Sequence, residues 1–238
     1  MSTVSALRLA GADEAADLGG YLTRLLRFDK AAAVRVVASG SAVGVWGQPP
    51  FDVLTLRTLA LDPAGPAAEA EAEAVAGSGA GSEVRTSVSV EADVTVSAGD
   101  LLHAIADDGA LPLPRPLAGA TAWTGFLPPR TGWRTVGELP VAEVETAALG
   151  GIAEFKARAE AIADKERTRA AVDRIAAEIW DRPLTFGLTV RAAHAARAMA
   201  FLGQAQSASA VVRSSGRWLR LDAPFGTVVL RTGSGLLA

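Results

Sequence analysis

The sequence contains no cysteine, and it has only two histidines, His103 and His194. The absence of cysteine excludes disulfide bonds, thiolate metal sites, iron–sulfur clusters and cysteine nucleophiles. The two histidines fall on separate predicted helices, so they do not form the cluster that zinc binding or general-base catalysis needs. We expect His103 to form a solvated helical pair with Asp107, four residues later. The sequence therefore predicts neither a metal nor a cofactor.

Long hydrophobic runs are also absent. Charged residues or Gly and Pro clusters interrupt every apolar stretch before it reaches the ~18–20 residues that cross a bilayer. Residues 1–20 contain early acidic side chains and lack the basic segment and apolar run of a secretory signal. The sequence therefore predicts a cytoplasmic protein without a membrane span.

Catalytic and phosphate-binding motifs are missing as well. The chain has no G-x-S-x-G, H-E-x-x-H, G-K-[ST] or EF-hand pattern. The segment "GSGAG" at 77–81 precedes a predicted strand instead of joining a strand to a helix, so it is not placed to bind a pyrophosphate. Carboxylates cluster at 69–73, 107–108 and 143–145, but none of these sets predicts an acid and a base held across a cleft. We therefore predict that the chain is not an enzyme.

The charge is unevenly distributed, although the net charge is only −3. From Arg182 to the end there are seven arginines and a single acid, Asp222. This basic end either forms a surface for a partner, an anion or a nucleic acid, or it neutralises acidic groups of its own fold. The residues that would form such a surface are Arg191, His194, Arg197, Arg213, Arg217 and Arg220.

Nucleic-acid binding is the weaker interpretation of the basic end. A helix followed by a hairpin is the order found in a winged helix. However, the segment "DRPLTFGL" at 181–188 is too long for the tight turn of a helix-turn-helix. Strand alternation also places Arg217 and Arg220 on opposite faces of the hairpin, so they do not line one exposed face.

Hydrophobic periodicity predicts an α+β fold with two modules. Each module has a helix, an antiparallel hairpin with a Ser-Gly turn and a third strand, and a helical pair lies between the modules. In the first module the helix covers 13–27, with Leu18, Leu22 and Leu25 on one face. Its strands are "AVRVVA", "AVGVW" and "FDVLTLRTLAL", followed by a strand "RTSVSVEADVTVSA" and a helix capped by Ser97.

Helical spacing predicts a helical pair, or one long bent helix, over 141–165 and 166–180. The second module follows it. A helix over 190–202 comes next, followed by the hairpin "AVVRSSGRWLRLD" and the strand "FGTVVLRT". The order of the first module is thus repeated.

Composition divides the chain into three parts. Residues 1–110 form an N-terminal α+β domain, in which the low-complexity segment 62–83 predicts a flexible insert. Residues 111–140 form a connector rich in proline and tryptophan, because each proline fixes φ and removes an N–H donor. Residues 141–238 form a C-terminal domain of helices and a β-hairpin.

A pair of similar strands suggests an internal duplication. The segments "PFDVLTLRT" at 50–58 and "PFGTVVLRT" at 224–232 share Pro, Phe, Leu, Arg and Thr, and each follows a helix and a hairpin. Strands rich in Val, Leu and Arg also match by chance, so duplication and coincidence both remain open. Duplication predicts that Phe51 and Phe225 turn into the core at equivalent corners.

The stretch "WTGFLPPRTGW" at 123–133 concentrates aromatic side chains in a short loop. Trp123, Phe126 and Trp133 can each bury roughly 100–250 Å², so we expect another surface to cover them. We predict an internal clip that seals the two halves, with Arg130 as its polar anchor. The alternative is a groove for a partner or a ligand.

The motifs "WTGFLPPRTGW" and "GRWLRLDAPFG" resemble those of a group of uncharacterised actinobacterial proteins of similar length. The resemblance covers most of the chain, and it implies an actinobacterial cytoplasmic origin and no assigned activity. We therefore expect a non-enzymatic scaffold or protein-interaction protein, which binds an unidentified protein or further copies of itself. The alternative is a nucleic-acid-binding regulator that uses the basic C-terminal helix and hairpin.

Overall fold

A computed structural model of the chain describes residues 5–62, 90–119, 122–204 and 207–232. The chain divides into two compact units. Unit 1 comprises Met1–Gln48 and Leu56–Leu127, and unit 2 comprises Pro49–Thr55 and Pro128–Ala238. The insert predicted at 62–83 lies outside the described residues beyond Asp62.

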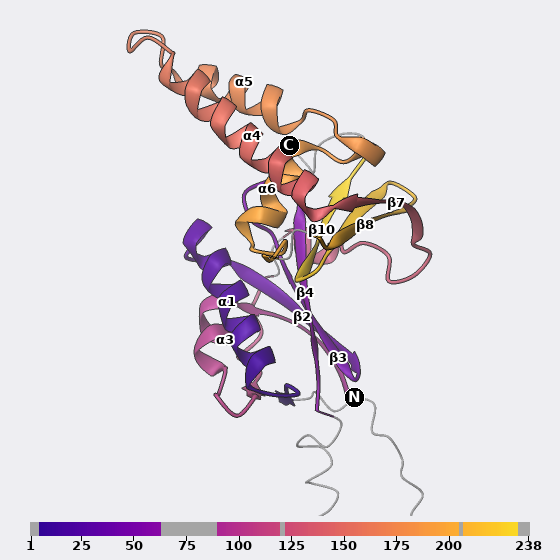
Figure 1. The fold of residues 1–238 in the computed structure, drawn as a ribbon. Coiled ribbons are helices and arrows are strands. Elements are labelled where there is room, and N and C mark those ends of the chain that lie inside the picture. Colours follow the sequence, from indigo (N-terminus) through magenta and orange to yellow (C-terminus); the bar gives the residue numbers. More distant parts are fainter. Residues whose placement is uncertain (1–4, 63–89, 120–121, 205–206, 233–238) are drawn as a thin grey trace, which may run out of the picture. The chain divides into compact units, whose positions relative to one another are not determined.

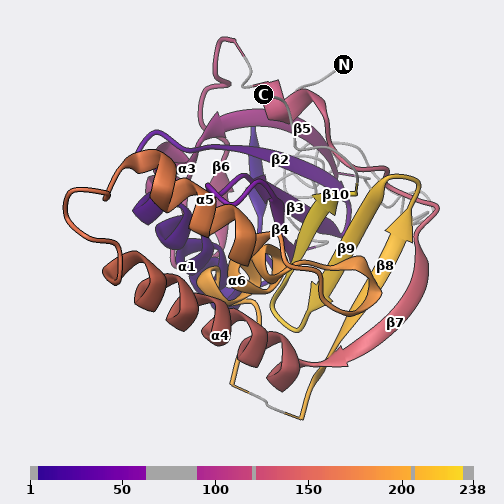
Figure 2. The same ribbon diagram turned by 90° about the horizontal axis from the view of Figure 1, so that it is seen from above.

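Unit 1 is an α+β module in which two helices lie together on one face of an antiparallel sheet (Figures 1 and 2). The strand order is β5-β2-β3-β4, and β1 pairs separately with β6. The elements are β1 (Ala6–Arg8), α1 (Ala12–Phe28), β2 (Ala33–Gly40), β3 (Ala42–Gly47), β4 (Leu54–Ala60, whose first two residues are counted with unit 2), β5 (Val90–Ser97), α3 (Ala98–Ala104), β6 (Ala110–Pro112) and the 3-10 helix η1 (Ala122–Gly125).

The helix α1 forms because its apolar residues recur at helical spacing. Leu18, Leu22 and Leu25 are all buried, as predicted. They lie close to the sheet, since a Cβ added to Gly47 in β3 would stand 2.8 Å from a methyl carbon of Leu25. The predicted cap of α3 is also confirmed, because the Ser97 hydroxyl accepts a hydrogen bond from the Asp100 N–H at 3.2 Å.

Unit 2 is a second α+β module with the strand order β10-β9-β8-β7, in which each neighbouring pair is antiparallel. The helix α6 packs against both β10 and α4, and α5 packs on α4 (Figures 1 and 2). The elements are β7 (Arg134–Pro140), α4 (Val141–Glu160), α5 (Arg169–Trp180), the 3-10 helix η2 (Thr185–Gly187), α6 (Val190–Ala198), β8 (Ser209–Ser215), β9 (Trp218–Ala223) and β10 (Gly226–Arg231).

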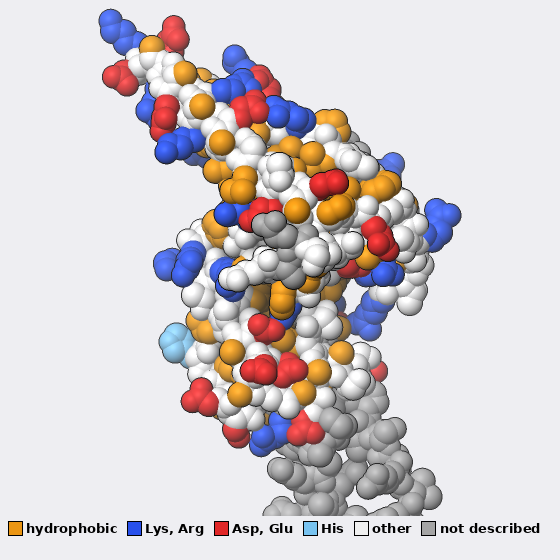
Figure 3. All heavy atoms as spheres, in the orientation of Figure 1, with side chains coloured by type: hydrophobic (Ala, Val, Ile, Leu, Met, Phe, Trp, Pro, Cys, Tyr) orange, Lys and Arg blue, Asp and Glu red, His pale blue; other side chains and the backbone are white. Residues whose placement is uncertain are grey.

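The predicted hairpin turns are confirmed at both Ser-Gly sites. Gly40 has φ 63° and Gly216 has φ 56°, which is the left-handed region that glycine adopts without steric cost. The helical pair is also confirmed, because α4 and α5 are separate helices. Their outer surface carries interspersed basic and acidic side chains (Figure 3), and Arg182 in the following loop donates to both carboxylate oxygens of Glu154 at 2.9 Å.

Two local expectations differ from the structure. The predicted connector contains the strand β7, which pairs with β8 through a register shift between Thr135 and Gly137. The many prolines of this segment indicated an irregular connector and not a strand. The strand tolerates its own proline because that residue stands at the last position, where a lost N–H donor is not needed. In unit 1, α3 ends at Ala104, so His103 does not reach Asp107 along a helix. Its Nδ1 lies 2.7 Å from the carbonyl oxygen of Gly99 instead.

The α+β class and the two-module architecture are confirmed, and the element order supports an internal duplication. Unit 1 begins with a strand, a helix and three sequential strands, and unit 2 has a strand, helices and three sequential strands. The predicted Phe51 and Phe225 corners are not equivalent, because Phe225 is 45% exposed and packs over Gly203. Phe201 takes the core position beside β10, where it is 2% exposed. The repeated order, and not the Pro-Phe pair, therefore supports duplication.

Among the described residues, no helix is both long enough and apolar enough to cross a membrane.

Candidate functional site

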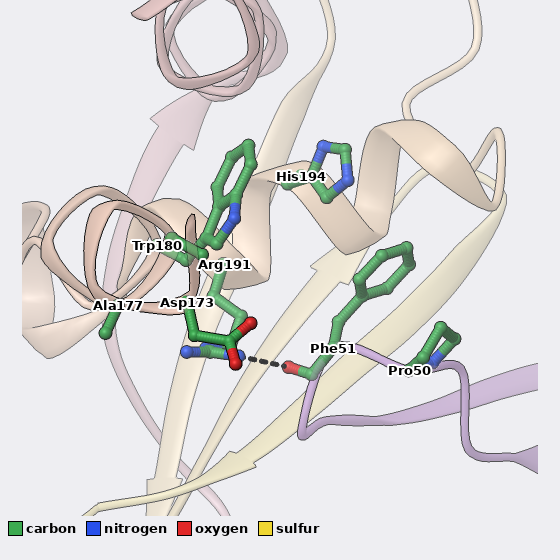
Figure 4. A pocket seen from close by; sticks show the side chains of 8 residues that line it. Pro50, Phe51, Asp173, Ala177, Trp180, Arg191 and His194 are labelled. Atoms are coloured by element: carbon green, nitrogen blue, oxygen red, sulfur yellow. Dashed lines mark hydrogen bonds between the residues drawn. The ribbon is translucent and has the colours of Figure 1, made fainter. Parts of the chain in front are cut away.

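Unit 2 contains an open pocket of about 360 Å³, which we call the Trp180 pocket (Figure 4). Three segments line it. The segment before β4 contributes Phe51, the last turns of α5 contribute Asp173, Ala177 and Trp180, and α6 contributes Arg191 and His194. Residues that are about 140 positions apart in the sequence therefore form one site.

Three aromatic rings form a connected cluster at this pocket. The Trp180 and His194 ring centroids are 4.7 Å apart with an interplanar angle of 26°, which is a stacked arrangement. The Phe51 ring meets His194 at 4.8 Å and 78°, edge to face. Figure 4 shows Trp180 and Phe51 on opposite sides of the pocket, with the His194 ring near both. The cluster gives the pocket a rigid apolar wall.

The position of Trp180 depends on close packing against α4. Phe155 of α4 lies 5.8 Å from Trp180, centroid to centroid. Gly151, one turn earlier, leaves space for the indole, since an added Cβ would lie 3.0 Å from Trp180 Cζ3 and 2.7 Å from Val190 Cγ1. The glycine therefore allows α4 to approach both α5 and α6.

Arg191 holds the segment before β4 against α6. Its Nε and Nη2 donate to Asp181 Oδ1 at 3.0 and 2.6 Å, and its Nη1 donates to Asp52 Oδ2 at 3.0 Å. A weaker contact of 3.5 Å joins Nη1 to the Phe51 carbonyl oxygen (Figure 4). Asp52 has φ 53°, an unfavourable backbone conformation for a non-glycine residue, so the ion pair helps to hold it there. Arg191 thus fixes the Phe51 wall of the pocket.

His194 contributes an uncharged ring to the pocket. Burial is the main cause that lowers the pKa of His194 from its ordinary value of 6.5, and the nearby charge of Arg197 lowers it further. Its Nδ1 is buried without a hydrogen-bond partner. The imidazole is therefore neutral near pH 7, and no carboxylate among the described residues orients it as a catalytic base would require.

The His194→Gln variant should lose less stability than the parent chain when the solution is acidified. Because the folded pKa lies below the unfolded value, the unfolded chain takes up the proton first as the pH falls. Stability linked to His194 is therefore complete above about pH 6.5 and is lost below it. Melting temperatures at about pH 7.5 and about pH 5.5 measure the effect.

The exposed His103 provides the matched control for this experiment, as His103→Gln. An acid-induced drop in melting temperature that is the same for the parent chain and for His194→Gln would contradict the assignment of a buried neutral His194.

The residues predicted as a partner or anion surface have separate environments. Arg191 and His194 line the pocket, whereas Arg197 pairs with Glu145 at 3.5 Å. Arg213 and Arg220 share the carboxylate of Asp222, at 3.0 and 2.9 Å. Among the described residues Arg217 has no carboxylate partner. These ion pairs favour neutralisation within the fold over a free basic surface.

The residues predicted as a connector clip are divided between the units. Trp123 belongs to η1 in unit 1. Phe126 is 57% exposed, and its N–H donates to the Trp123 carbonyl oxygen at the end of η1. Trp133 and the exposed Arg130 belong to unit 2. Trp133 is half-buried, its Nε1 donates to the Pro129 carbonyl oxygen at 2.8 Å, and the Arg220 guanidinium lies 4.8 Å from its ring. The clip predicts that both indoles are mostly buried, and Trp123 and Trp133 are both of intermediate exposure.

Trp133→Ala should lower the free energy of unfolding by about 1–2 kcal/mol. The change removes one hydrogen bond and one cation–π contact at a half-exposed position, without leaving a closed cavity. Urea denaturation measures the difference. Trp133→Phe keeps an aromatic face but lacks the N–H donor, so it should lose less free energy of unfolding than Trp133→Ala. A loss above about 3 kcal/mol would indicate the fully buried clip instead.

Sequence patterns did not place Phe51, Asp173 and Trp180 in one site. Two features of the sequence could have indicated it. Gly150 and Gly151 interrupt an otherwise favourable helix, which indicates a close contact. Trp180 ends an amphipathic helix, whose terminal turns commonly face neighbouring segments. Among the described residues, no group of three or more His, Cys, Asp or Glu side chains can hold a metal ion.

Two family models match the chain. Domain of unknown function (DUF8010) matches residues 2–125, which is more than half of the chain, and Domain of unknown function (DUF8185) matches residues 128–235. The chain belongs to the DUF8010 family. In this DUF8010 protein the two matches meet where unit 1 ends at Leu127 and unit 2 continues at Pro128. A search of curated proteins gave no match.

Solved structures that resemble this DUF8010 protein include bacterial sliding clamps. A DNA polymerase sliding clamp from Pseudomonas aeruginosa has a TM-score of 0.46 at 9% identity, and the DNA polymerase III subunit beta from the same organism has 0.46 at 10%. A DnaN sliding clamp from Bartonella birtlesii bound to griselimycin has 0.38 at 12%. Each alignment covers 98% of this chain, which spans 65–66% of the clamp chains. At these TM-scores the likeness carries no argument about fold or function.

Proposed function

We propose that this chain is a non-enzymatic cytoplasmic protein of actinobacteria that binds a partner protein, and that the Trp180 pocket receives a side chain of that partner. The observation that carries the proposal is the open pocket itself, with its wall of stacked aromatic rings. Its volume of about 360 Å³ lies within the roughly 300–1,000 Å³ range of ligand sites. Pockets of this kind accommodate the anchor residues that dominate protein interfaces.

The charged groups of the pocket support binding and not catalysis. Arg191 is engaged by two carboxylates, and no carboxylate among the described residues orients His194. An acid–base mechanism needs a titratable pair that is free to exchange protons with a substrate. The rigid pairing of these side chains instead preorganises a surface, which reduces the entropy lost when a partner binds.

The experiment compares proteins captured from the host cell by three forms of the full chain. Ala177→Phe places a bulky ring in the pocket from an exposed position of α5. Ala170→Phe introduces the same ring on the same helix at an exposed residue outside the pocket. The proposal predicts a protein that the parent chain and Ala170→Phe retain and that Ala177→Phe loses. Identical captured sets for all three forms would contradict it.

Retention on random duplex DNA provides the test of the alternative function. Phosphate contacts give an affinity that falls steeply with salt. Because Arg191, Arg197, Arg213 and Arg220 already pair with carboxylates, we expect little retention even at low salt. Strong and salt-sensitive retention would favour the nucleic-acid-binding regulator over the protein-interaction function.

A further inference from the structure

We infer that the partner's side chain in the Trp180 pocket is cationic, an arginine or a lysine. This inference rests on the proposed function and specifies the chemistry of the partner. It follows from three properties of the described residues. They are the aromatic side chains that line the pocket, the net charge around it, and the carboxylates that already bind its one lining arginine, Arg191.

The aromatic wall favours a cation over an anion. Phe51 and Trp180 line the pocket from opposite sides (Figure 4), and aromatic rings attract positive groups. The aliphatic stem of a lysine or an arginine also packs well on apolar surface, such as that of Ala177 beside them. One side chain can therefore satisfy both the apolar lining and the aromatic rings.

The fixed charges around the pocket are net negative. Arg191 lies between Asp52 and Asp181, so this triad carries two carboxylates and one guanidinium. Among the described residues, Asp173 at the pocket pairs only with Arg169, which lies 3.6 Å away and four positions earlier on the same helix. Both side chains of that pair are strongly exposed, at 67% and 94%, so the pair is weak and Asp173 can accept a better donor. The lining groups Asp173 and Arg191, taken with these ion-pair partners, thus comprise three carboxylates and two guanidiniums.

The one arginine among the described lining residues is already engaged by carboxylates. Each nitrogen of Arg191 donates at least one hydrogen bond to Asp181 or Asp52, and a second contact of Nη1 goes to the Phe51 carbonyl oxygen. His194 adds no positive charge, because its ring is neutral near pH 7. A carboxylate in the pocket would lose part of its hydration and would face the like charge of Asp173.

The test uses three small probes against the intact chain, with NMR shifts of the Trp180 indole N–H as the readout. The probes are N-acetyl-arginine amide, the isosteric but neutral N-acetyl-citrulline amide, and N-acetyl-leucine amide. The arginine probe should bind with roughly millimolar affinity, as expected for a ligand of this size, and the neutral probes should bind at least about fivefold more weakly. The indole resonance is assigned from its loss in Trp180→Phe.

A matched pair of variants tests whether the charge of Asp173 contributes to binding of the arginine probe. Asp173→Asn should weaken binding of the arginine probe about fivefold while leaving the citrulline probe unchanged, because it removes one charge-assisted hydrogen bond. Asp164→Asn, at an exposed position outside the pocket, should change neither. Because Asp173 is exposed, its variant should fold like the parent chain, which circular dichroism verifies.

The outcomes separate this inference from the proposed function. Equal binding of arginine and citrulline, stronger binding of leucine, or no shift with any probe would overturn the cationic assignment. If capture of a partner protein still depends on position 177 in those cases, the proposed function stands. Loss of that dependence would overturn the proposed function itself, whichever probe binds.

Discussion

Trp180→Ala is expected to lower the free energy of unfolding by about 3 kcal/mol and to abolish partner capture. The indole stacks on His194, contacts Phe155 and lies against the Gly151 surface of α4, so truncation leaves a cavity between three helices. Buried Trp→Ala changes cost about 3–5 kcal/mol, and the partial exposure of Trp180 places it at the lower end. Urea denaturation and the capture experiment measure the two effects.

Trp218, another tryptophan of unit 2, provides the control. Trp218 in β9 is also half-buried, and Arg231 lies 5.4 Å from its ring centroid, but it does not line the pocket. Trp218→Ala should cost about 1–2 kcal/mol and should leave capture unchanged. If the two variants lose partner binding equally, general destabilisation and not the pocket would explain the loss.

Two adjacent glycines of α4 are expected to respond to alanine with opposite signs. Gly150 is exposed with no atom near its missing Cβ, so Gly150→Ala should raise the free energy of unfolding by about 0.5–1 kcal/mol through higher helix propensity. Gly151→Ala gains the same propensity, but its Cβ would clash with Val190 and Trp180 at 2.7 and 3.0 Å. Overpacking should make it net destabilising by about 1–3 kcal/mol.

Thermal melts of the two single variants measure this difference. Gly151→Ala should also reduce partner capture, since it displaces the Trp180 wall of the pocket, whereas Gly150→Ala should not. Stabilisation by both substitutions would contradict the close approach of α4 to α5 and α6.

Local patterns were sufficient to predict much of the fold. The burial of Leu18, Leu22 and Leu25 follows from helical spacing, and the turns at Gly40 and Gly216 follow from the conformational freedom of glycine. These features depend on residues within one or two turns of each other, so their signals lie within short windows of the sequence.

The candidate site could not be predicted in the same way. Phe51 and His194 meet only after the chain folds, and periodicity contains no information about contacts over such separations. Burial of Phe225 was predicted from its likeness to Phe51, but Phe201 from the loop after α6 fills that part of the core. The strand β7 was missed because prolines near it dominated the local pattern.

Site-specific photo-crosslinking in the host cell tests the central claim most directly. A p-benzoylphenylalanine at position 177 stands at the pocket, and the same residue at position 170 stands on the same helix outside it. The proposed function predicts a single protein adduct from position 177, none from position 170, and loss of the adduct when Trp180→Ala is added. The same adducts from both positions, or no protein adduct from position 177, would contradict the assignment of the Trp180 pocket as the partner-binding site.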